Sequence, residues 1–236
     1  MKTQSLFLLL ACLLFSAPGI SAQTKVSILG DSYSTFHDYV SPATNLCWYG
    51  VPGEKKENDV TRVEQTWWHL LIHKHHLQLE RNNSYSGATI CCTGYKQTDY
   101  SGRSFITRMY NLGAPDVILV FGGTNDSWAG VPIGSYQYAA WTKKDLYSFR
   151  PAFCHLLASL KQLYPEARIY NITNSELSGD IASSIAAICG HYQITNICLR
   201  DIEKQWGHPS VRGMQDISEQ VGEVLLKDLF PLHKGE

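Results

Sequence analysis

The sequence predicts an α/β protein in which helices cover both faces of a parallel sheet. The strand candidates are short, continuous apolar runs, as expected of strands that are buried on both faces. Segments with the apolar spacing of an amphipathic helix lie between these runs. Strands that alternate with helices favour a doubly wound α/β layer over a sandwich or a barrel.

We expect five strands and four main helices in a single domain over residues 23–236, since the chain has no internal repeat and no low-complexity linker. The strand candidates are, in chain order, Val26–Leu29, Leu77–Leu79 with its extension, Val117–Phe121, Arg168–Ile172 and Thr195–Leu199. The helix candidates are a segment that begins at Trp67, then Phe149–Leu163, Ile181–Cys189 and Ile217–Leu229.

Three longer stretches are expected to be loops: His37–Thr61, Thr93–Ser104 and Ser127–Lys144. Loops of this length in a compact domain are often functional, and ligands of open α/β sheets bind at the carboxyl ends of the strands. Trp48 and Trp128 are therefore candidate walls of a substrate pocket. Alternatively, the aromatic rings only fix the loops to the body of the domain.

The first 22 residues have the composition of a secretory signal peptide. Lys2 precedes the apolar run Leu6–Phe15, and Ile20-Ser21-Ala22 forms a small-residue cleavage site. The run is too short for a permanent membrane span, so we expect an exported chain, periplasmic or secreted, without stable membrane insertion. Cys12 weakly resembles a lipobox cysteine, but its place inside the apolar run argues against a lipoprotein.

Charge and cysteine content exclude some classes of function. The formal net charge is −1 and no basic run stands out, which argues against nucleic-acid binding. After residue 22 six cysteines remain, without a C-x-x-C pair that would suggest zinc. Disulfides are compatible with export, and their pairing stays open. Cys154, Cys189 and Cys198 have apolar neighbours, as buried cysteines often do.

The first strand candidate ends in Gly30-Asp31-Ser32. A serine on a sharp strand-to-helix turn keeps its hydroxyl clear of the sheet and close to unpaired N–H groups. This is what a serine nucleophile with an oxyanion donor requires. Alternatively, Asp31 or Ser32 simply caps a helix.

Three further segments contain candidate catalytic groups. Asn125 follows the third strand after two glycines, and its amide could donate to an oxyanion, unless it only forms an Asx turn. Gly87 follows the second strand and could present its backbone N–H. His208 precedes Pro209, which favours an extended backbone, so its imidazole could act as a general base toward Ser32.

Together, Gly30-Asp31-Ser32, Gly87, Gly123-x-Asn125-Asp126 and His208-Pro209 resemble the SGNH/GDSL hydrolase family, and they span nearly the whole chain after residue 22. The resemblance implies a flavodoxin-like three-layer α/β/α fold and a serine esterase or lipase. It implies Ser32 as nucleophile and His208 as base. It also implies three oxyanion donors, the Ser32 N–H, the Gly87 N–H and the Asn125 side chain, with no metal and no organic cofactor.

Two positions depart from the family pattern. Tyr33 replaces the leucine of the GDSL form, at a position that we expect to pack rather than react. Gln205 replaces the aspartate that usually orients the histidine. Either the Gln205 backbone carbonyl accepts the imidazole proton, which gives a serine–histidine dyad, or Asp201 or Glu203 supplies a carboxylate from a rearranged loop. We favour the dyad.

Asp31 and Asp126 stand beside the candidate catalytic groups, and we expect both to hold turns through hydrogen bonds rather than to react. We hypothesise a serine esterase that deacetylates a carbohydrate or other glycan, because sugar rings rest well on Trp and Tyr. One alternative is a short-chain or lipid acyl esterase. Another, of a different class, is a non-catalytic glycan-binding protein on the same fold. The acyl group, the alcohol and the oligomeric state stay open.

Overall fold

A five-stranded parallel sheet forms the centre of the molecule, which is a computed structural model that describes residues 23–54 and 57–229. The strands are β1 (Lys25–Gly30), β2 (Gln78–Ser84), β3 (Val117–Phe121), β4 (Arg168–Thr173) and β5 (Thr195–Cys198), in the order β2-β1-β3-β4-β5. This is the flavodoxin-like order. The proposed signal peptide over residues 1–22, with Cys12, lies outside the described residues.

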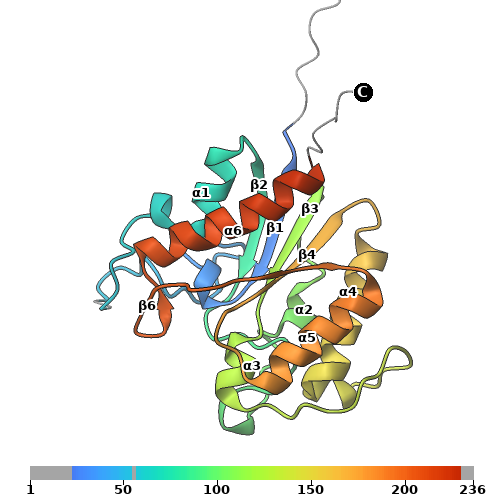
Figure 1. Cartoon of the computed structure of the whole chain (residues 1–236). Helices are drawn as coiled ribbons and strands as arrows, with labels where there is room; N and C mark the ends of the chain where they lie inside the picture. The colour runs from blue at the N-terminus through green and yellow to red at the C-terminus, as the bar shows by residue number, and fades with distance from the viewer. Residues whose placement is uncertain (1–22, 55–56, 230–236) are drawn as a thin grey trace, which may run out of the picture.

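Helices cover both faces of this sheet (Figure 1). One face carries α1 (Trp67–Lys74) and α6 (Val211–Leu229), and the other carries α2 (Phe105–Arg108), α4 (Phe149–Leu163) and α5 (Gly179–Tyr192). Successive side chains of a strand point to opposite faces, so Ile28 packs into the core under α1 and α6, and Leu29 into the core under α4 and α5. The predicted three-layer α/β/α fold is confirmed.

The helix α6 begins at Val211, earlier than the expected start at Ile217. Gly213 weakened the helical pattern in this stretch. In the structure a Cβ at Gly213 would lie 2.1 Å from the Glu203 carbonyl oxygen, so a close backbone approach requires the glycine. The prediction for Cys198 was also wrong, because Cys154 and Cys189 are buried as expected but Cys198 is exposed.

The strands β1, β2 and β3 end at the same edge of the sheet. Gly30 is in register with Ser84 of β2 and with Phe121 of β3. Since the strands are parallel, the segments that follow them meet at this edge, and these contain Ser32, Gly87 and Asn125. Among the described helices, none combines the length and the apolar character that a membrane span needs.

Candidate active site

Ser32 lies on a tight turn directly beyond β1, at the start of the 3₁₀ helix η1 (Ser32–Ser34). A Cβ at Gly30 would lie 2.5 Å from the Ser84 Oγ, so the approach of β2 to the turn requires a glycine. The Oδ1 of Asp31 accepts the Tyr33 N–H at 3.0 Å and caps the short helix, as expected for this aspartate. Glycine and aspartate thus shape the turn that presents Ser32.

His208 contacts Ser32 through its imidazole. The Nε2 of His208 lies 2.9 Å from the Ser32 Oγ, and its Nδ1 lies 3.1 Å from the Trp206 carbonyl oxygen. A carbonyl can only accept a hydrogen bond, so Nδ1 carries the proton and the lone pair of Nε2 faces the serine hydroxyl. The pair has the geometry to move a proton from Ser32 to His208.

The carbonyl beside His208 belongs to Trp206, so the prediction of the Gln205 carbonyl was wrong by one residue. Gln205 of β6 (Lys204–Gln205) pairs with His208 of β7 (His208–Pro209) across an antiparallel ladder. Trp206 and Gly207 form the two-residue turn between these strands, with φ of 53° and 72°. These positive values are typical of a type I′ hairpin, which turns the Trp206 carbonyl toward the imidazole.

The two carboxylates that we considered as alternatives have other surroundings. The Glu203 Oε1 accepts a hydrogen bond from the Ser210 hydroxyl at the start of α6. Asp201 is exposed and has a φ of 54°. The geometry supports the carbonyl at Nδ1 rather than either of these carboxylates.

Asn125 lies in the first turn of α3 (Thr124–Ala129), directly after β3. Its Nδ2 donates to the Ala88 carbonyl at 3.0 Å, and its Oδ1 accepts the Tyr95 hydroxyl at 2.8 Å. Together these bonds fix the amide orientation and leave one N–H for a further acceptor. Burial raises the pKa of Tyr95 to about 12, so its phenol stays a donor at neutral pH.

Tyr95 was not identified from the sequence. The 3₁₀ helix η3 (Tyr95–Gln97) that carries it is one turn long and lies within the expected loop Thr93–Ser104. No local pattern relates this tyrosine to Asn125, which is 30 residues away in the chain.

Gly87 lies beside Ala88, whose carbonyl holds Asn125, and it has a φ of +77°. A Cβ built on Gly87 would meet no atom within 4 Å. The side of Gly87 that a side chain would occupy is therefore open, so a reacting group could approach its backbone closely.

The carboxylates of Asp31 and Asp126 and the guanidinium of Arg108 are buried close to the segments that carry Ser32, Gly87 and Asn125. Asp126 accepts the N–H groups of Ile90 (2.8 Å) and Cys91 (3.2 Å), which holds the segment after Gly87, as expected. Burial raises the pKa of Asp31 to about 7 and that of Asp126 to about 6. Burial lowers the pKa of Arg108 to about 9, and the charge of Asp31 opposes this shift.

Four aromatic rings surround the imidazole of His208. The indole of Trp48 stacks on it, with 3.6 Å between the ring centroids and 6° between the planes. Tyr33, Trp128 and Tyr49 are tilted to it by 62°, 65° and 81°, at centroid distances of 5.4, 5.9 and 6.3 Å. The structure thus brings together the two expected wall residues, Trp48 and Trp128, at His208.

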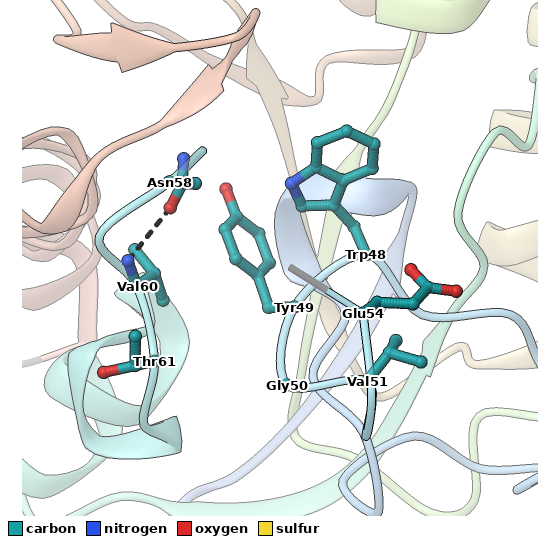
Figure 2. A pocket seen from close by; sticks show the side chains of 8 residues that line it. All are labelled: Trp48, Tyr49, Gly50, Val51, Glu54, Asn58, Val60 and Thr61. Atoms are coloured by element: carbon teal, nitrogen blue, oxygen red, sulfur yellow. Dashed lines mark hydrogen bonds between the residues drawn. The ribbon is translucent and has the colours of Figure 1, made fainter. Parts of the chain in front are cut away.

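A pocket of about 470 Å³ begins at Trp48 (Figure 2). It is lined by Trp48, Tyr49, Gly50, Val51, Glu54, Asn58, Val60 and Thr61. The Tyr49 hydroxyl and the Asn58 amide donate to the Pro209 carbonyl, at 3.0 and 3.1 Å, next to His208. A pocket with both polar and apolar walls therefore lies beside Trp48 and Tyr49, the two lining residues whose rings contact the imidazole.

The chain matches the model of the GDSL-like lipase/acylhydrolase family over residues 24–225. A structure from Bacteroides uniformis described as a GDSL-like lipase is 74% identical, with a TM-score of 0.86 over 86% of this chain and 95% of that one. Another of that description, from Bacteroides ovatus, is 53% identical, with a TM-score of 0.86 over 88% and 100% of the two chains.

More distant structures share the fold. A family two carbohydrate esterase from Clostridium thermocellum, in complex with cellohexaose, is 18% identical, with a TM-score of 0.60 over 87% of this chain and 64% of that one. No curated protein matches the sequence. The range matched by the family model includes the turn of Ser32 and the hairpin of His208, and the two Bacteroides structures cover most of the chain. The chain therefore belongs to the GDSL-like lipase/acylhydrolase family and is a carboxylic ester hydrolase.

Proposed function

We propose that this ester hydrolase is an exported serine esterase that removes acyl groups, acetyl above all, from a carbohydrate or other glycan. The observation that carries the mechanism is the 2.9 Å contact between the Ser32 Oγ and the His208 Nε2. The Trp206 carbonyl at Nδ1 holds the imidazole in the tautomer that can accept the serine proton.

The Ser32 oxygen attacks the ester carbonyl carbon while His208 takes the hydroxyl proton. The N–H groups of Ser32 and Gly87 and the amide of Asn125 donate to the oxyanion that forms. The tetrahedral intermediate collapses, the alcohol leaves with the proton from His208, and an acyl-serine remains. Water then attacks this ester with His208 again as base, which releases the acid and restores Ser32.

Aromatic and polar surfaces near Ser32 support a sugar as the alcohol. Trp128 is 45% exposed and Trp206, which we did not single out from the sequence, is 72% exposed. The pocket beside Trp48 places Glu54 and Asn58 next to aromatic rings. Apolar sugar faces fit such rings, and sugar hydroxyls fit such polar groups. The family two carbohydrate esterase bound to cellohexaose shares this fold.

The main alternative is a short-chain or lipid acyl esterase, which a long apolar channel would favour. The mixed lining of the pocket beside Trp48 favours the glycan instead. We do not retain the alternative of a non-catalytic glycan-binding protein, because the chain belongs to a hydrolase family and has a serine in contact with an imidazole.

The mechanism is tested by the hydrolysis of p-nitrophenyl acetate, butyrate and octanoate and of acetylated oligosaccharides. Ser32→Ala should lower kcat by about 10⁴-fold or more, because it removes the nucleophile. The matched control Ser34→Ala, in the same turn, should stay within about tenfold, since it removes one hydrogen bond, that from Trp67. Unchanged turnover in Ser32→Ala would overturn the mechanism, and faster turnover of octanoate than of all acetyl esters would overturn the proposed substrate class.

Export is tested separately, by expression of the full chain with its first 22 residues in a bacterial host. We expect a periplasmic or extracellular product that begins at Gln23 by mass spectrometry. An uncleaved product in the cytoplasm would contradict export without affecting the proposed chemistry.

A further inference from the structure

We infer that Trp48 is a positioning residue that stabilises the protonated form of His208 through the face of its indole ring. The inference rests on the proposed function, because it concerns the imidazolium that forms when His208 takes the Ser32 proton. It assigns to Trp48 a role in the reaction itself, beyond that of a pocket wall. The observation is the stack of the two rings, with centroids 3.6 Å apart and planes 6° apart.

The face of an indole ring carries negative electrostatic potential and attracts a cation within about 6 Å of its centroid. Neutral imidazole gains less from this potential than imidazolium does. The stack therefore favours the state in which His208 holds the extra proton, which is the state formed during attack by Ser32. Tyr33, Trp128 and Tyr49 are strongly tilted and more distant, so Trp48 alone of these rings offers a parallel face.

Trp48 is fixed relative to Ser32 as well as to His208. The Trp48 backbone N–H donates to the Thr35 Oγ1 at 2.8 Å, and this hydroxyl donates to the Ser32 carbonyl at 2.9 Å. The backbone of Trp48 is thus anchored to the turn that carries the serine. A ring that stacks on the imidazole before charge develops needs little rearrangement when His208 is protonated, which is how preorganised groups stabilise a transition state.

The stack acts on a different part of the imidazole from its hydrogen bonds. Ser32 and the Trp206 carbonyl engage the two nitrogens in the plane of the ring, whereas Trp48 covers its face. The indole therefore adds to the orientation that the Trp206 carbonyl provides and does not compete with it.

Other titratable groups near the imidazole must be separated from this effect. Burial raises the pKa values of Tyr33 on η1 and Tyr49 on the loop, so both phenols are neutral at physiological pH. Asp31, next to Ser32, is buried with a pKa of about 7, and its charge acts on Tyr33 and Tyr49, as that of Asp59 does on Tyr49. The other charged side chains nearby are Lys204 of β6, which lies 5.9 Å from the Tyr33 ring centroid and pairs with Glu176 at 2.8 Å, and Glu54 in the pocket beside Trp48. The NMR titration of the imidazole itself separates the pKa of His208 from that of Asp31. A Glu54→Gln background isolates the contribution of the indole from that of the carboxylate that lines the pocket.

The test compares Trp48→Phe and Trp48→Leu with the native protein. Two quantities are measured: the imidazole pKa of His208 by NMR, and the acid limb of kcat/KM against pH for p-nitrophenyl acetate. In Trp48→Leu we expect the imidazole pKa and the midpoint of the acid limb to shift to lower pH by about 0.5 pH units or more. The shift should be smaller in Trp48→Phe, which keeps an aromatic face. We expect kcat to fall about tenfold in Trp48→Leu, with KM changed by less than about threefold.

The control is Trp128→Leu, which removes a tilted ring and should move the imidazole pKa less than Trp48→Leu does. The shift caused by Trp48→Leu should persist in the Glu54→Gln background. An imidazole pKa equal to the native value in folded Trp48→Leu would overturn the inference. If that variant does not fold, as judged by circular dichroism, Trp48→Met, which also lacks an aromatic face, takes its place, and a native pKa in Trp48→Met overturns the inference equally. If the native protein hydrolysed none of the test esters, the proposed function would be refuted. The NMR comparison of the imidazole pKa would still decide the role of Trp48.

Discussion

The hydroxyl of Tyr33 donates a hydrogen bond to the backbone carbonyl of Gly207, with 2.6 Å between the two oxygens and 174 residues between them in the chain. The bond joins the serine turn to the hairpin of His208. The Tyr33 side chain is fully buried, which agrees with its predicted role as a packing residue. Its ring also contacts the His208 imidazole. One side chain beside Ser32 thus helps to set the position of the proposed base.

Tyr33→Phe keeps the ring and removes this hydrogen bond. We expect kcat for p-nitrophenyl acetate to fall about tenfold with KM nearly unchanged, because a small displacement of His208 from Ser32 slows proton transfer more than it weakens substrate binding. Steady-state kinetics of the purified variant measure both constants. Tyr164→Phe is the control, since its partly buried hydroxyl donates to the Met109 carbonyl in the body of the domain, away from His208. A native kcat in Tyr33→Phe would show that packing alone holds the hairpin.

Tyr95→Phe tests whether the tyrosine orients the Asn125 amide. Without the donor at Oδ1, the amide can rotate and present its oxygen to the oxyanion, so we expect kcat to fall about tenfold. Asn125→Ala should cost about 10²–10³ in kcat, as loss of one oxyanion donor usually does. Tyr100→Phe, in the same loop, is the control. If Tyr95→Phe matches native kcat while Asn125→Ala is impaired, the Ala88 carbonyl alone fixes the amide.

Asp201→Asn and Glu203→Gln test the assignment of the Trp206 carbonyl as the partner of Nδ1. We expect each variant to keep kcat within about tenfold of the native value, since Asp201 is exposed and Glu203 binds Ser210. Loss of a carboxylate that orients a catalytic histidine costs about 10⁴ in kcat. A loss of that size in either variant would identify it as a third catalytic member and refute the assignment.

The sheet and the main helices were predictable because each has a strong local pattern. The run Val117–Phe121, for example, is apolar throughout and appears in the structure with the same bounds. The two-residue strands β6 and β7 could not be predicted, because their stability depends on contacts such as the bonds of Tyr49 and Asn58 to Pro209. For the same reason the sequence predicted the carbonyl of Gln205 behind His208, whereas the neighbouring residue Trp206 supplies it.

The partners of the proposed catalytic groups also lie beyond local patterns. Tyr95, Trp48 and Trp206 reach Asn125 and His208 from loops and turns whose path depends on the packed domain. Sequence spacing can place a residue on a strand end, but it does not give the direction of a loop. The candidate catalytic residues were therefore predictable, whereas the groups that orient them required the structure.

Asp31→Asn should make the stability of the protein less sensitive to pH. The carboxyl of Asp31 is fully buried with a pKa of about 7 in the folded state, against about 3.9 in an unfolded chain. The folded state therefore holds this proton more tightly, and the resulting stabilisation is complete below about pH 4 and is lost as the pH rises to about 7. Asparagine keeps an acceptor for the Tyr33 N–H and cannot ionise. We expect the free energy of unfolding of the variant, relative to the native protein, to increase by about 1–4 kcal/mol between pH 4 and pH 8.

Urea unfolding of both proteins at the two pH values measures this difference. Asp99→Asn is the control, because hydrogen bonds from Ser101 lower the pKa of Asp99 on the surface. That carboxylate is ionised in the folded state at both pH 4 and pH 8, so its removal should change the stability by nearly the same amount at the two pH values. If Asp31→Asn instead shows the same difference from the native protein at pH 4 and at pH 8, the Asp31 carboxylate is stabilised as an anion in the fold, and its neighbour Arg108 is the group that compensates its charge.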